Sequence, residues 1–467
     1  MPEIALQTLL ADLPPEPKSV LGEIKSMIAD SRRKMVVLDD DPTGTQTVHD
    51  VSVLTEWTIP LLQAELESDA NVFYILTNSR SLSQGAAIAL GREIGENIRE
   101  AVKRSGQDVV VVSRGDSTLR GHFPGEVEAL AGGLSTQFDG LIIAPFFNEG
   151  GRYTIADIHY VVNNGRAIPA GETEFAQDPV FGYSESNLRR WVTEKTVGRI
   201  TEGEVESISI QDIRTGTALQ KLLALRNGQI CIINAACDAD MEHAVLDILK
   251  AEALGRRYLY RTAASFVRAR AGIETRNLLT AAELATDSRT GGLVIVGSFV
   301  PKTTAQLENL RAFHAFVEIE LDARELLDEK RASGVVEQAV SLTNQSITVG
   351  RDVLIYTSRT LVTGQDAQSS LQMGHRIAES LVTCVRELAD CPRFLVAKGG
   401  ITSSDVATKG LNVRKARVLG QILPGVSVWR LGNESRFPGM NYVVFPGNVG
   451  NERGLSDVLD KLGGASC

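Results

Sequence analysis

Three consecutive carboxylates stand near the beginning of the chain, in the stretch VVLDDDPTGTQ. Asp39, Asp40 and Asp41 follow an apolar run and precede Thr43 and Gly44. Adjacent carboxylates repel one another unless cations, a metal ion or hydrogen-bond donors offset their charge. In a binding site such groups orient hydroxyls or accept protons as general bases. The alternative for this stretch alone is an exposed turn or helix cap, because Asp, Pro, Thr and Gly are common turn formers.

Cationic and hydroxyl side chains follow three later apolar runs. Arginine binds carboxylates through a planar fork, and it also offsets clustered aspartates. Hydroxyls and carboxylates together suit a polyhydroxy acid as ligand. The motifs are TNSR, with Asn78, Ser79 and Arg80; SRGDSTLRG, with Arg114, Asp116, Ser117, Thr118 and Arg120; and PFFNEGGR, with Asn148, Glu149 and Arg152.

The second half of the chain carries glycine loops in place of charge clusters. GSFVPKTT contains Gly297 and Ser298, AKGGITSS contains Gly399 and Gly400, and FPGNVGNERG contains Gly447. Each precedes a helical pattern, where free backbone amides can receive a phosphate. No Walker A loop and no GxGxxG fingerprint is present. Glycine turns at helix caps are the structural alternative for each loop, and three such loops in one domain make nucleotide binding an equal alternative.

Histidine and cysteine do not form a recognisable metal pattern. His122 and His159 lie beside the acidic and cationic motifs, but neither has a second ligand at helical spacing, so zinc is not expected. A packing role is favoured for both, with a catalytic base as the alternative. The five cysteines form no CxxC pair, which is typical of reduced thiols in a cytoplasm.

All of these motifs follow short β-branched runs that alternate with helical patterns such as residues 84–105. This alternation predicts mostly parallel sheets flanked by helices, with ligands beyond the carboxyl ends of the strands. A helical stretch is expected over residues 258–286. The predicted strands are Met35–Leu38, Val51–Leu54, Val72–Thr77, Val109–Ser113, Leu141–Ala144, Ile230–Asn234, Leu293–Gly297, Val317–Leu321, Val353–Thr357, Phe394–Ala397 and Tyr442–Phe445.

Length and charge restrict the class of protein. A chain of 467 residues exceeds what one core usually supports, so we expect an arm over residues 1–33 and α/β domains over 34–287 and 288–467. The net charge of −10 argues against nucleic acid or acidic membranes as partners. Without a signal peptide or an 18-residue apolar run, we expect a cytoplasmic protein.

The ordered motifs DDDPTGT, TNSR, RGDSTLRGH, NEGGRYT, QDPVFGYSES, GSFVPKTTAQ, KGGITSSDVA and PGNVG resemble the four-carbon acid sugar kinase family. The resemblance covers nearly the whole chain. It implies an N-terminal α/β domain that binds the acid sugar, a C-terminal nucleotide-binding α/β domain, and an active site in the cleft between them. Members transfer the γ-phosphoryl group of ATP to the terminal hydroxyl of acids such as threonate, erythronate or 3-oxotetronate.

The resemblance also implies positions for the two ligands. ATP and Mg²⁺ are the expected cofactors, with no metal ligands assigned, and a homodimer is the default assembly for such an enzyme of carbohydrate metabolism. Acid-sugar contacts are expected at Asp40, Arg80, Arg114, Gly115, Asp116, Ser117 and Arg120, and ATP contacts at Ser298, Gly399, Gly400, Pro446, Gly447, Asn448 and Val449.

Phosphoryl transfer depends on alignment and charge neutralisation more than on covalent help. We expect Arg80 and Arg114 to hold the substrate carboxylate, while Asp40, Asp41 or Asp116 orients the attacking hydroxyl or accepts its proton. Asp116 could instead orient the arginines through salt bridges. A non-catalytic acid-sugar or nucleotide sensor is the main alternative, and a nicotinamide-dependent oxidoreductase is disfavoured by the missing dinucleotide fingerprint.

Overall fold

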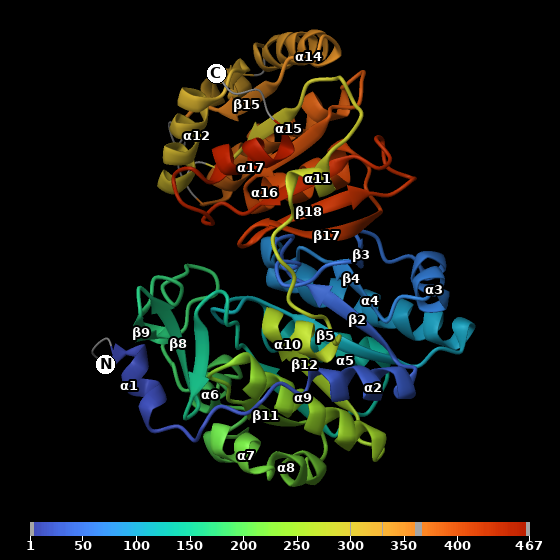
Figure 1. Cartoon of the computed structure of the whole chain (residues 1–467), viewed down its shortest axis with the longest axis vertical. Helices are drawn as coiled ribbons and strands as arrows, with labels where there is room; N and C mark the ends of the chain where they lie inside the picture. Colours follow the sequence, from blue (N-terminus) through green and yellow to red (C-terminus); the bar gives the residue numbers. More distant parts are fainter. Residues whose placement is uncertain (1–3, 299, 329, 360–366, 464–467) are drawn as a thin grey trace. The chain divides into compact units, whose positions relative to one another are not determined.

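The computed structural model describes residues 4–298, 300–328, 330–359 and 367–463. The chain divides into two compact units (Figure 1). The first unit comprises Met1–Gly44 and Glu56–Thr275, and the second comprises Thr45–Thr55 and Arg276–Cys467. Both are α/β, as the alternating pattern predicts.

The first unit is built on a parallel sheet. Its strand order is β10-β11-β6-β12-β5-β2-β4, and every neighbouring pair is parallel. Apart from β10 at the edge, the strands are mostly apolar and buried because helices cover both faces. They are β2 (Lys34–Asp39), β4 (Val72–Leu76), β5 (Val109–Arg114), β6 (Gly140–Ala144), β10 (Glu206–Ile208), β11 (Gln229–Ile233) and β12 (Tyr258–Thr262).

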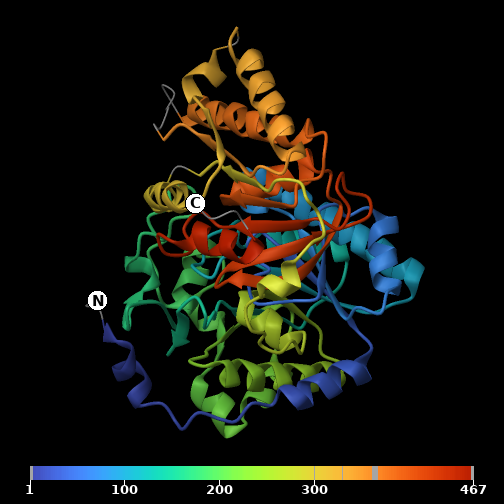
Figure 2. The ribbon, with the colours of Figure 1, turned by 45° about the horizontal axis from the view of Figure 1, so that its top comes forward.

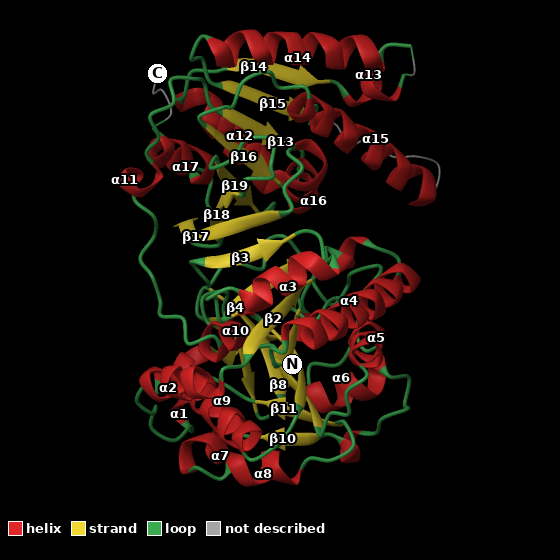
Figure 3. Cartoon of the chain, turned by 90° about the vertical axis from the view of Figure 1, so that its right-hand side faces the viewer, coloured by secondary structure: helices red, strands yellow, loops and turns green. Residues whose placement is uncertain are grey.

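The helices of the first unit pack in two groups (Figure 3). The helices α3, α4 and α5 contact one another on one face, and α2, α7, α8, α9 and α10 pack together on the other. Helix α4 begins after the N-cap Ser83 and ends at Gly106 in the left-handed region, so both of its ends are capped. The bounds are α2 (Leu21–Ser31), α3 (Ile59–Glu67), α4 (Gln84–Ser105), α5 (Gly125–Leu134), α6 (Leu188–Lys195), α7 (Ile210–Thr215), α8 (Ala218–Ala224), α9 (Asp238–Ala253) and α10 (Ala264–Arg270).

A small antiparallel sheet, in the order β1-β9-β8-β7, completes the first unit. It brings the N-terminal segment, expected to be a separate arm, into contact with residue 166 and its neighbours. Helix α2 also packs against α9 and buries Ile24 and Ile28, an i, i+4 pair (Figure 2). The elements are β1 (Ile4–Ala5), α1 (Leu6–Ala11), β7 (Arg152–Ile155), β8 (Ile158–Asn163) and β9 (Arg166–Pro169).

The second unit contains a mixed sheet in the order β3-β17-β18-β19-β16-β13-β15-β14. Pairs from β19 to β14 are parallel, and those from β3 to β19 are antiparallel. The strands are β3 (Val51–Leu54), β13 (Leu293–Val296), β14 (Val317–Leu321), β15 (Val353–Thr357), β16 (Phe394–Lys398), β17 (Lys415–Leu423), β18 (Val426–Leu431) and β19 (Asn441–Phe445).

Helices cover this second sheet on both sides. The helices α11, α12 and α17 pack together, and α13, α14, α15 and α16 form the other group (Figure 3). Val296, Leu310, Phe445 and Leu459 contribute to the core between α12, α17 and the sheet. The bounds are α11 (Ala281–Leu284), α12 (Pro301–Phe313), α13 (Ala323–Leu327), α14 (Ala332–Thr348), α15 (Ala367–Arg386), α16 (Gly400–Asp405) and α17 (Gly454–Leu462).

Two features differ from the sequence-based expectations. Residues 258–286 are not uniformly helical, because YLYRT forms β12 in the middle of the first sheet and is followed by the shorter α10 and α11. The aromatic residues of YLYRT favour a buried strand here. The residues that follow it are rich in Arg and Ala, and this composition suggested a helix over the whole stretch. The strand β3 pairs with β17 and so belongs to the second unit, and the change of unit falls after residue 275 instead of near 288.

Candidate functional site

The acidic and cationic motifs of the first unit meet at one edge of its sheet. The strands β12, β5, β2 and β4 are adjacent and parallel, so the residues after their carboxyl ends are neighbours. Backbone hydrogen bonds join these loops directly: Thr77 N donates to Asp39 O at 2.9 Å, Asp40 N to Arg114 O at 3.3 Å, and Gly115 N to Thr262 O at 2.9 Å. The sheet therefore brings together the loops in which we predicted the acid-sugar contacts.

Asp116 is held by two arginines. Its carboxylate lies 3.3 Å from Arg80 Nη1 and 2.8 Å from Arg120 Nε, and it accepts a hydrogen bond from Thr118 Oγ1. Burial by itself would raise the pKa of Asp116, but Arg80 and Arg120 hold it well below its usual range. A carboxylate so stabilised in its charged form is a weak proton acceptor. The orienting role of Asp116 is therefore favoured over a role as base.

Asp41 is similarly engaged. Its carboxylate pairs with Arg80 Nη2 and accepts hydrogen bonds from the backbone and hydroxyl of Thr43. Burial opposes ionisation, but Arg80 and Thr43 together lower the pKa of Asp41 below its usual value. Both Asp41 and Asp116 thus serve to fix Arg80.

Arg114 is buried beneath this cluster. Its Nη1 lies 3.2 Å from Asp39 Oδ1, and both side chains are nearly inaccessible to solvent. Burial raises the pKa of Asp39 to about 7 despite the neighbouring Arg114. Arg114 uses Nη1 for a protein carboxylate, while its buried Nε has no hydrogen-bond partner among the described residues.

Asp40 differs from its two neighbours. It is 2% exposed, and neither carboxylate oxygen has a hydrogen-bond partner among the described residues. Arg261 Nη2, from β12, lies 3.6 Å from Oδ2, which is within ion-pair range but too long for a hydrogen bond. Buried carboxylates are normally hydrogen-bonded. The lack of donors among the described residues therefore identifies Asp40 as the carboxylate of the cluster that can still accept hydrogen bonds.

Gly115 and Ser117 support the site through their backbones. A Cβ on Gly115 would lie 2.0 Å from Arg261 Cζ, so the missing side chain makes room for that arginine. Ser117 O accepts a hydrogen bond from His159 Nε2 at 2.8 Å, while His159 Nδ1 lies 3.0 Å from Thr154 Oγ1. Burial lowers the pKa of His159 to about 4, so it is neutral and packs, as favoured from the sequence.

His122 also makes only internal contacts. Its Nε2 lies 3.1 Å from both Ser79 O and Leu82 O, and its ring packs edge-on against Phe181. These contacts position the TNSR loop, which carries Arg80. Neither histidine is placed as a proton acceptor for a ligand.

The sequence did not single out Arg261 and did not assign a role to Arg152, Phe175 or Tyr183. Arg261 was hidden in a stretch read as helix, although YLYRT has the composition of a strand. The ring of Phe175 lies under the guanidinium groups of both Arg120 and Arg152. The hydroxyl of Tyr183 donates to Thr118 O at 2.7 Å and so anchors the loop that carries Asp116.

The glycine loops of the second unit also converge. They follow β13, β16 and β19, which are adjacent and parallel. Gly399 N donates to Phe445 O at 2.8 Å, and Ser298 N donates to Lys398 O at 3.3 Å. The predicted ATP contacts on all three loops therefore lie at one edge of this sheet, although Phe299 falls outside the described residues.

Close packing around Ser298 explains why two of these positions are glycine. Gly399 has a φ of 121°, and a Cβ there would lie 3.2 Å from Ser298 Cβ. A Cβ on Gly447 would lie 3.2 Å from Ser298 Oγ. Thr303 Oγ1, in the first turn of α12, bonds both Ser298 Oγ and Gly447 O at 3.1 Å. The loops form a compact backbone-lined cradle of the kind that binds phosphates.

Polar side chains hold the last loop in place. Lys302 Nζ donates to Asn448 O at 3.2 Å, and Gln306 Nε2 donates to Val449 O at 3.0 Å. Lys398 Nζ donates to Pro446 O at 2.6 Å and Gly447 O at 3.1 Å, and it lies 3.9 Å from the centre of the Phe445 ring. Lys398 is fully buried, and burial together with the charge of Lys302 lowers its pKa to about 7.

We expect Lys398→Met to remove a pH dependence from the stability of the protein. The pKa of Lys398 is about 7 in the fold against an ordinary 10.5, so between these values the unfolded chain binds more protons. The free energy of unfolding therefore rises with pH over this window because of Lys398. In denaturant titrations, the free energy of unfolding of the wild type minus that of Lys398→Met should increase from pH 7 to pH 10. A constant difference would contradict the lowered pKa of Lys398, and Lys409→Met, at an exposed position, should keep the wild-type trend.

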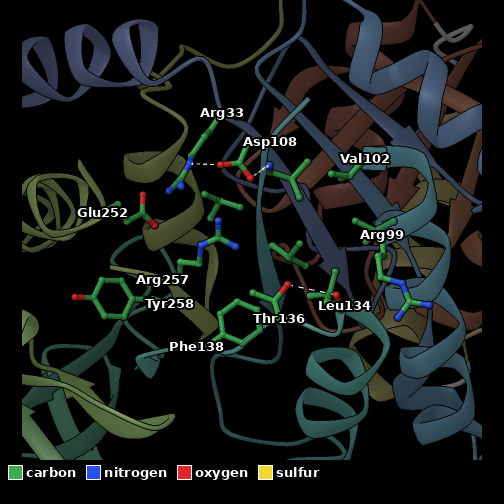
Figure 4. Close-up of a pocket in the computed structure, with 14 residues that line it drawn as sticks. Arg33, Arg99, Val102, Asp108, Leu134, Thr136, Phe138, Glu252, Arg257 and Tyr258 are labelled. Carbon is green, nitrogen blue, oxygen red and sulfur yellow. Dashed lines mark hydrogen bonds and ion pairs between the residues drawn. The ribbon is translucent and has the colours of Figure 1, made fainter. Parts of the chain in front are cut away.

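A separate pocket of 140 Å³ lies in the first unit (Figure 4). Its lining includes the first residues of β5 and β12, so it occupies the edge opposite the acidic and cationic loops. Arg33 Nε pairs with Asp108 at 2.8 Å, Arg99 Nη1 donates to Gly133 O at 2.9 Å, and Glu252 accepts from Arg270 at 2.6 Å. These lining groups are largely satisfied within the protein and do not indicate a ligand.

Two further properties bear on function. Within residues 4–298, 300–328, 330–359 and 367–463, no three His, Cys, Asp or Glu side chains form a group able to hold a metal ion. None of the helices described there is both long and apolar enough to cross a membrane.

Comparison with known proteins identifies the two units. Residues 35–270 match the family described as a sugar-binding N-terminal domain, and residues 293–455 match a nucleotide-binding C-terminal domain. No curated protein matches the chain. The molecule is therefore a two-domain protein that combines a sugar-binding and a nucleotide-binding domain. Since the first match alone spans just over half of the chain, the protein belongs to the four-carbon acid sugar kinase family.

Solved structures share this fold. A Haemophilus influenzae protein of the DUF1537 family is 18% identical with a TM-score of 0.61, over 91% of this chain and 100% of that one. A Salmonella typhimurium LT2 protein, whose name carries a provisional tRNA synthase assignment, is 18% identical with a TM-score of 0.64, over 91% and 98% of the two chains. At this identity the likeness concerns the fold.

Proposed function

We propose that this protein is an ATP-dependent kinase that transfers the γ-phosphoryl group to the terminal hydroxyl of a four-carbon acid sugar of the threonate, erythronate or 3-oxotetronate type. The observation that carries the proposal is that neither carboxylate oxygen of Asp40 accepts a hydrogen bond from a described residue. A buried carboxylate with unused acceptor capacity, in a sugar-binding domain linked to a nucleotide-binding domain, is suited to receive a substrate hydroxyl.

Asp40 is the proposed acceptor of the hydroxyl proton. Asp41 and Asp116 are both paired with Arg80, whereas the side chain of Asp40 makes no hydrogen bond to any residue described in the structure. Because only 2% of Asp40 is exposed, the substrate reaches it only when the surrounding loop side chains shift. We therefore expect substrate binding to reorder the loop after β2. Arg80 pairs with Asp41 and Asp116, and Arg261 lies beside Asp40, so the two arginines hold these aspartates in place.

The cradle formed by Ser298, Gly399 and Gly447 is the proposed site for the ATP phosphates. The amides of Ser298 and Gly399 already bond backbone oxygens, so the donors for phosphate are the amides in the first turn of α12, which are not used within the helix. Mg²⁺, when bound, would neutralise charge on the phosphates. It usually keeps several waters and takes one or two carboxylates, which is compatible with a chain whose described residues form no dedicated metal cluster.

A panel of four-carbon acids, incubated with ATP and Mg²⁺, tests the function. We expect ADP release that depends on one or more of the acids, and a product whose phosphate is on the terminal carbon. Binding of both an acid and ATP without ADP release would instead support the sensor alternative. A panel in which no acid binds or reacts would contradict the proposed substrate class.

A further inference from the structure

Arg152 is an arginine beside the acidic and cationic loops that pairs with no carboxylate among the described residues. In the described part of the chain, Arg152 forms no ion pair with Asp or Glu, and its Nη1 donates only to the backbone Gly150 O. Its Nε is buried and has no hydrogen-bond partner among the residues that the structure describes. By contrast, the other arginines of the cluster are paired with aspartates: Arg80 with Asp41 and Asp116, Arg114 with Asp39, Arg120 with Asp116, and Arg261 with Asp40.

The surroundings of Arg152 favour an anion. Arg120 and Arg152 both lie over the ring of Phe175, with Cζ atoms 5.2 and 5.6 Å from its centre. Burial lowers the pKa of Arg152, and the positive charge of Arg120 adds to this effect, while the charges of Asp116 and Glu174 oppose it without cancelling it. Two guanidinium groups held beside one aromatic ring repel each other, and a carboxylate placed between them would remove that repulsion.

Arg152 belongs to the same cluster as the proposed base. Arg120, its neighbour over Phe175, pairs with Asp116 at 2.8 Å, and the backbone oxygen of Arg120 accepts from Arg261 Nη2 at 3.3 Å. That same Arg261 nitrogen lies 3.6 Å from Asp40 Oδ2. Arg152 itself begins β7, so the small sheet supplies this part of the site.

We propose that Arg152, together with Arg120, binds the carboxylate of the acid sugar. This inference rests on the proposed function and changes the residues assigned to that carboxylate. Arg80 and Arg114 are each paired with protein aspartates, whereas Arg152 pairs with no carboxylate among the described residues and keeps a buried Nε without a partner. The acid group of the substrate would then bind over Phe175, with its hydroxyl end directed to Asp40.

Isothermal titration calorimetry with threonate and with erythronate, in the absence of nucleotide, tests this assignment in Arg152→Gln. We expect the affinity for the acid to fall by roughly 10- to 100-fold, the range for a lost hydrogen bond to a charged group. Arg152→Lys should show an intermediate loss, because it keeps the charge but not the fork. In turnover assays the loss should fall mainly on the KM for the acid, with the KM for ATP unchanged.

Two controls separate the assignment from general damage. Arg190→Gln removes an arginine of the same unit that forms an exposed pair with Glu185, and it should bind the acids as the wild type does. Threitol, which lacks the carboxylate, should not distinguish wild type from Arg152→Gln. Thermal unfolding should show that both variants fold.

The possible failures are distinguishable. Wild-type binding of an acid with unchanged affinity in Arg152→Gln would overturn the role of Arg152 but leave the proposed function standing. Wild-type protein that binds neither acid would overturn both. A loss of affinity for threitol equal to that for threonate would show that Arg152 shapes the pocket without recognising the carboxylate, and would also overturn the inference.

Discussion

Asp40→Asn should lower kcat by about 10²- to 10⁴-fold, the usual contribution of a general base. The substitution keeps the size of the side chain but removes its capacity to accept a proton. Asp40 is the member of the aspartate cluster whose carboxylate makes no hydrogen bond, so no other described group competes for that capacity. Steady-state kinetics with the best acid of the panel, combined with calorimetric binding of the acid and of ATP, would measure the effect. The KM for ATP should not change.

Two comparison variants make this result interpretable. Asp108→Asn alters an aspartate at the opposite edge of the same sheet, paired with Arg33, and should leave kcat unchanged. Asp116→Asn should mainly raise the KM for the acid, because Arg80 and Arg120 lose their common anchor. Near-normal turnover in Asp40→Asn would exclude Asp40 as the base. A larger loss of kcat in Asp116→Asn than in Asp40→Asn would reverse the two roles.

The second large effect is expected in the nucleotide-binding unit, where Gly399→Ala should weaken ATP binding by about 10- to 100-fold. The φ of 121° disfavours any side chain, at a free-energy cost on the order of 1–3 kcal/mol, and the new methyl would press on Ser298 Cβ at 3.2 Å. The cradle can relieve this strain only by moving Ser298 or the backbone of residue 399. Calorimetric titration with ATP measures the loss, and the affinity for the acid sugar should stay unchanged.

Gly439→Ala is the matched control for that experiment. Gly439 lies in the same unit and also has a positive φ, 76°, but a Cβ there would contact nothing within 4 Å. We expect this variant to lose some stability and to bind ATP normally. If Gly399→Ala and Gly439→Ala lost ATP affinity equally, the loss would come from a general decrease in the stability of the unit and not from a local change in the phosphate site. Unchanged ATP binding in Gly399→Ala would remove Gly399 from the phosphate site.

Many of the strands could be predicted because their runs of apolar residues in the sequence are also the segments that are buried in the fold. The strands β2, β4, β5 and β6 are short β-branched runs buried on both faces, and the motifs that follow them lie where parallel topology requires. The strands of the small antiparallel sheet were missed, as were β17 and β18. Their residues alternate in exposure or include turns and charges, so a window of apolar residues does not reveal them.

The sequence predicted which loops form the site, but not the role of each side chain in it. Asp40, Arg80, Arg114 and Asp116 were grouped correctly at one edge, since strand order alone makes their loops neighbours. Pairing within the group depends on distances of a few ångströms, and no spacing in the sequence encodes it. Arg114 was expected to hold the substrate, yet it is buried against Asp39.

The sequence by itself determined the chemistry and its order along the chain: a set of acidic, cationic and hydroxyl loops, then a set of glycine loops, each following a strand of an α/β domain. Those features depend on residue type and on hydrophobic period, which are local properties. Only the tertiary structure decided which charges neutralise one another, because ion pairs and hydrogen bonds join residues far apart in sequence. Among the described residues of the sugar-binding unit, the carboxylate of Asp40 has no hydrogen-bond donor and Arg152 has no carboxylate partner, and the proposed chemistry follows from these two observations.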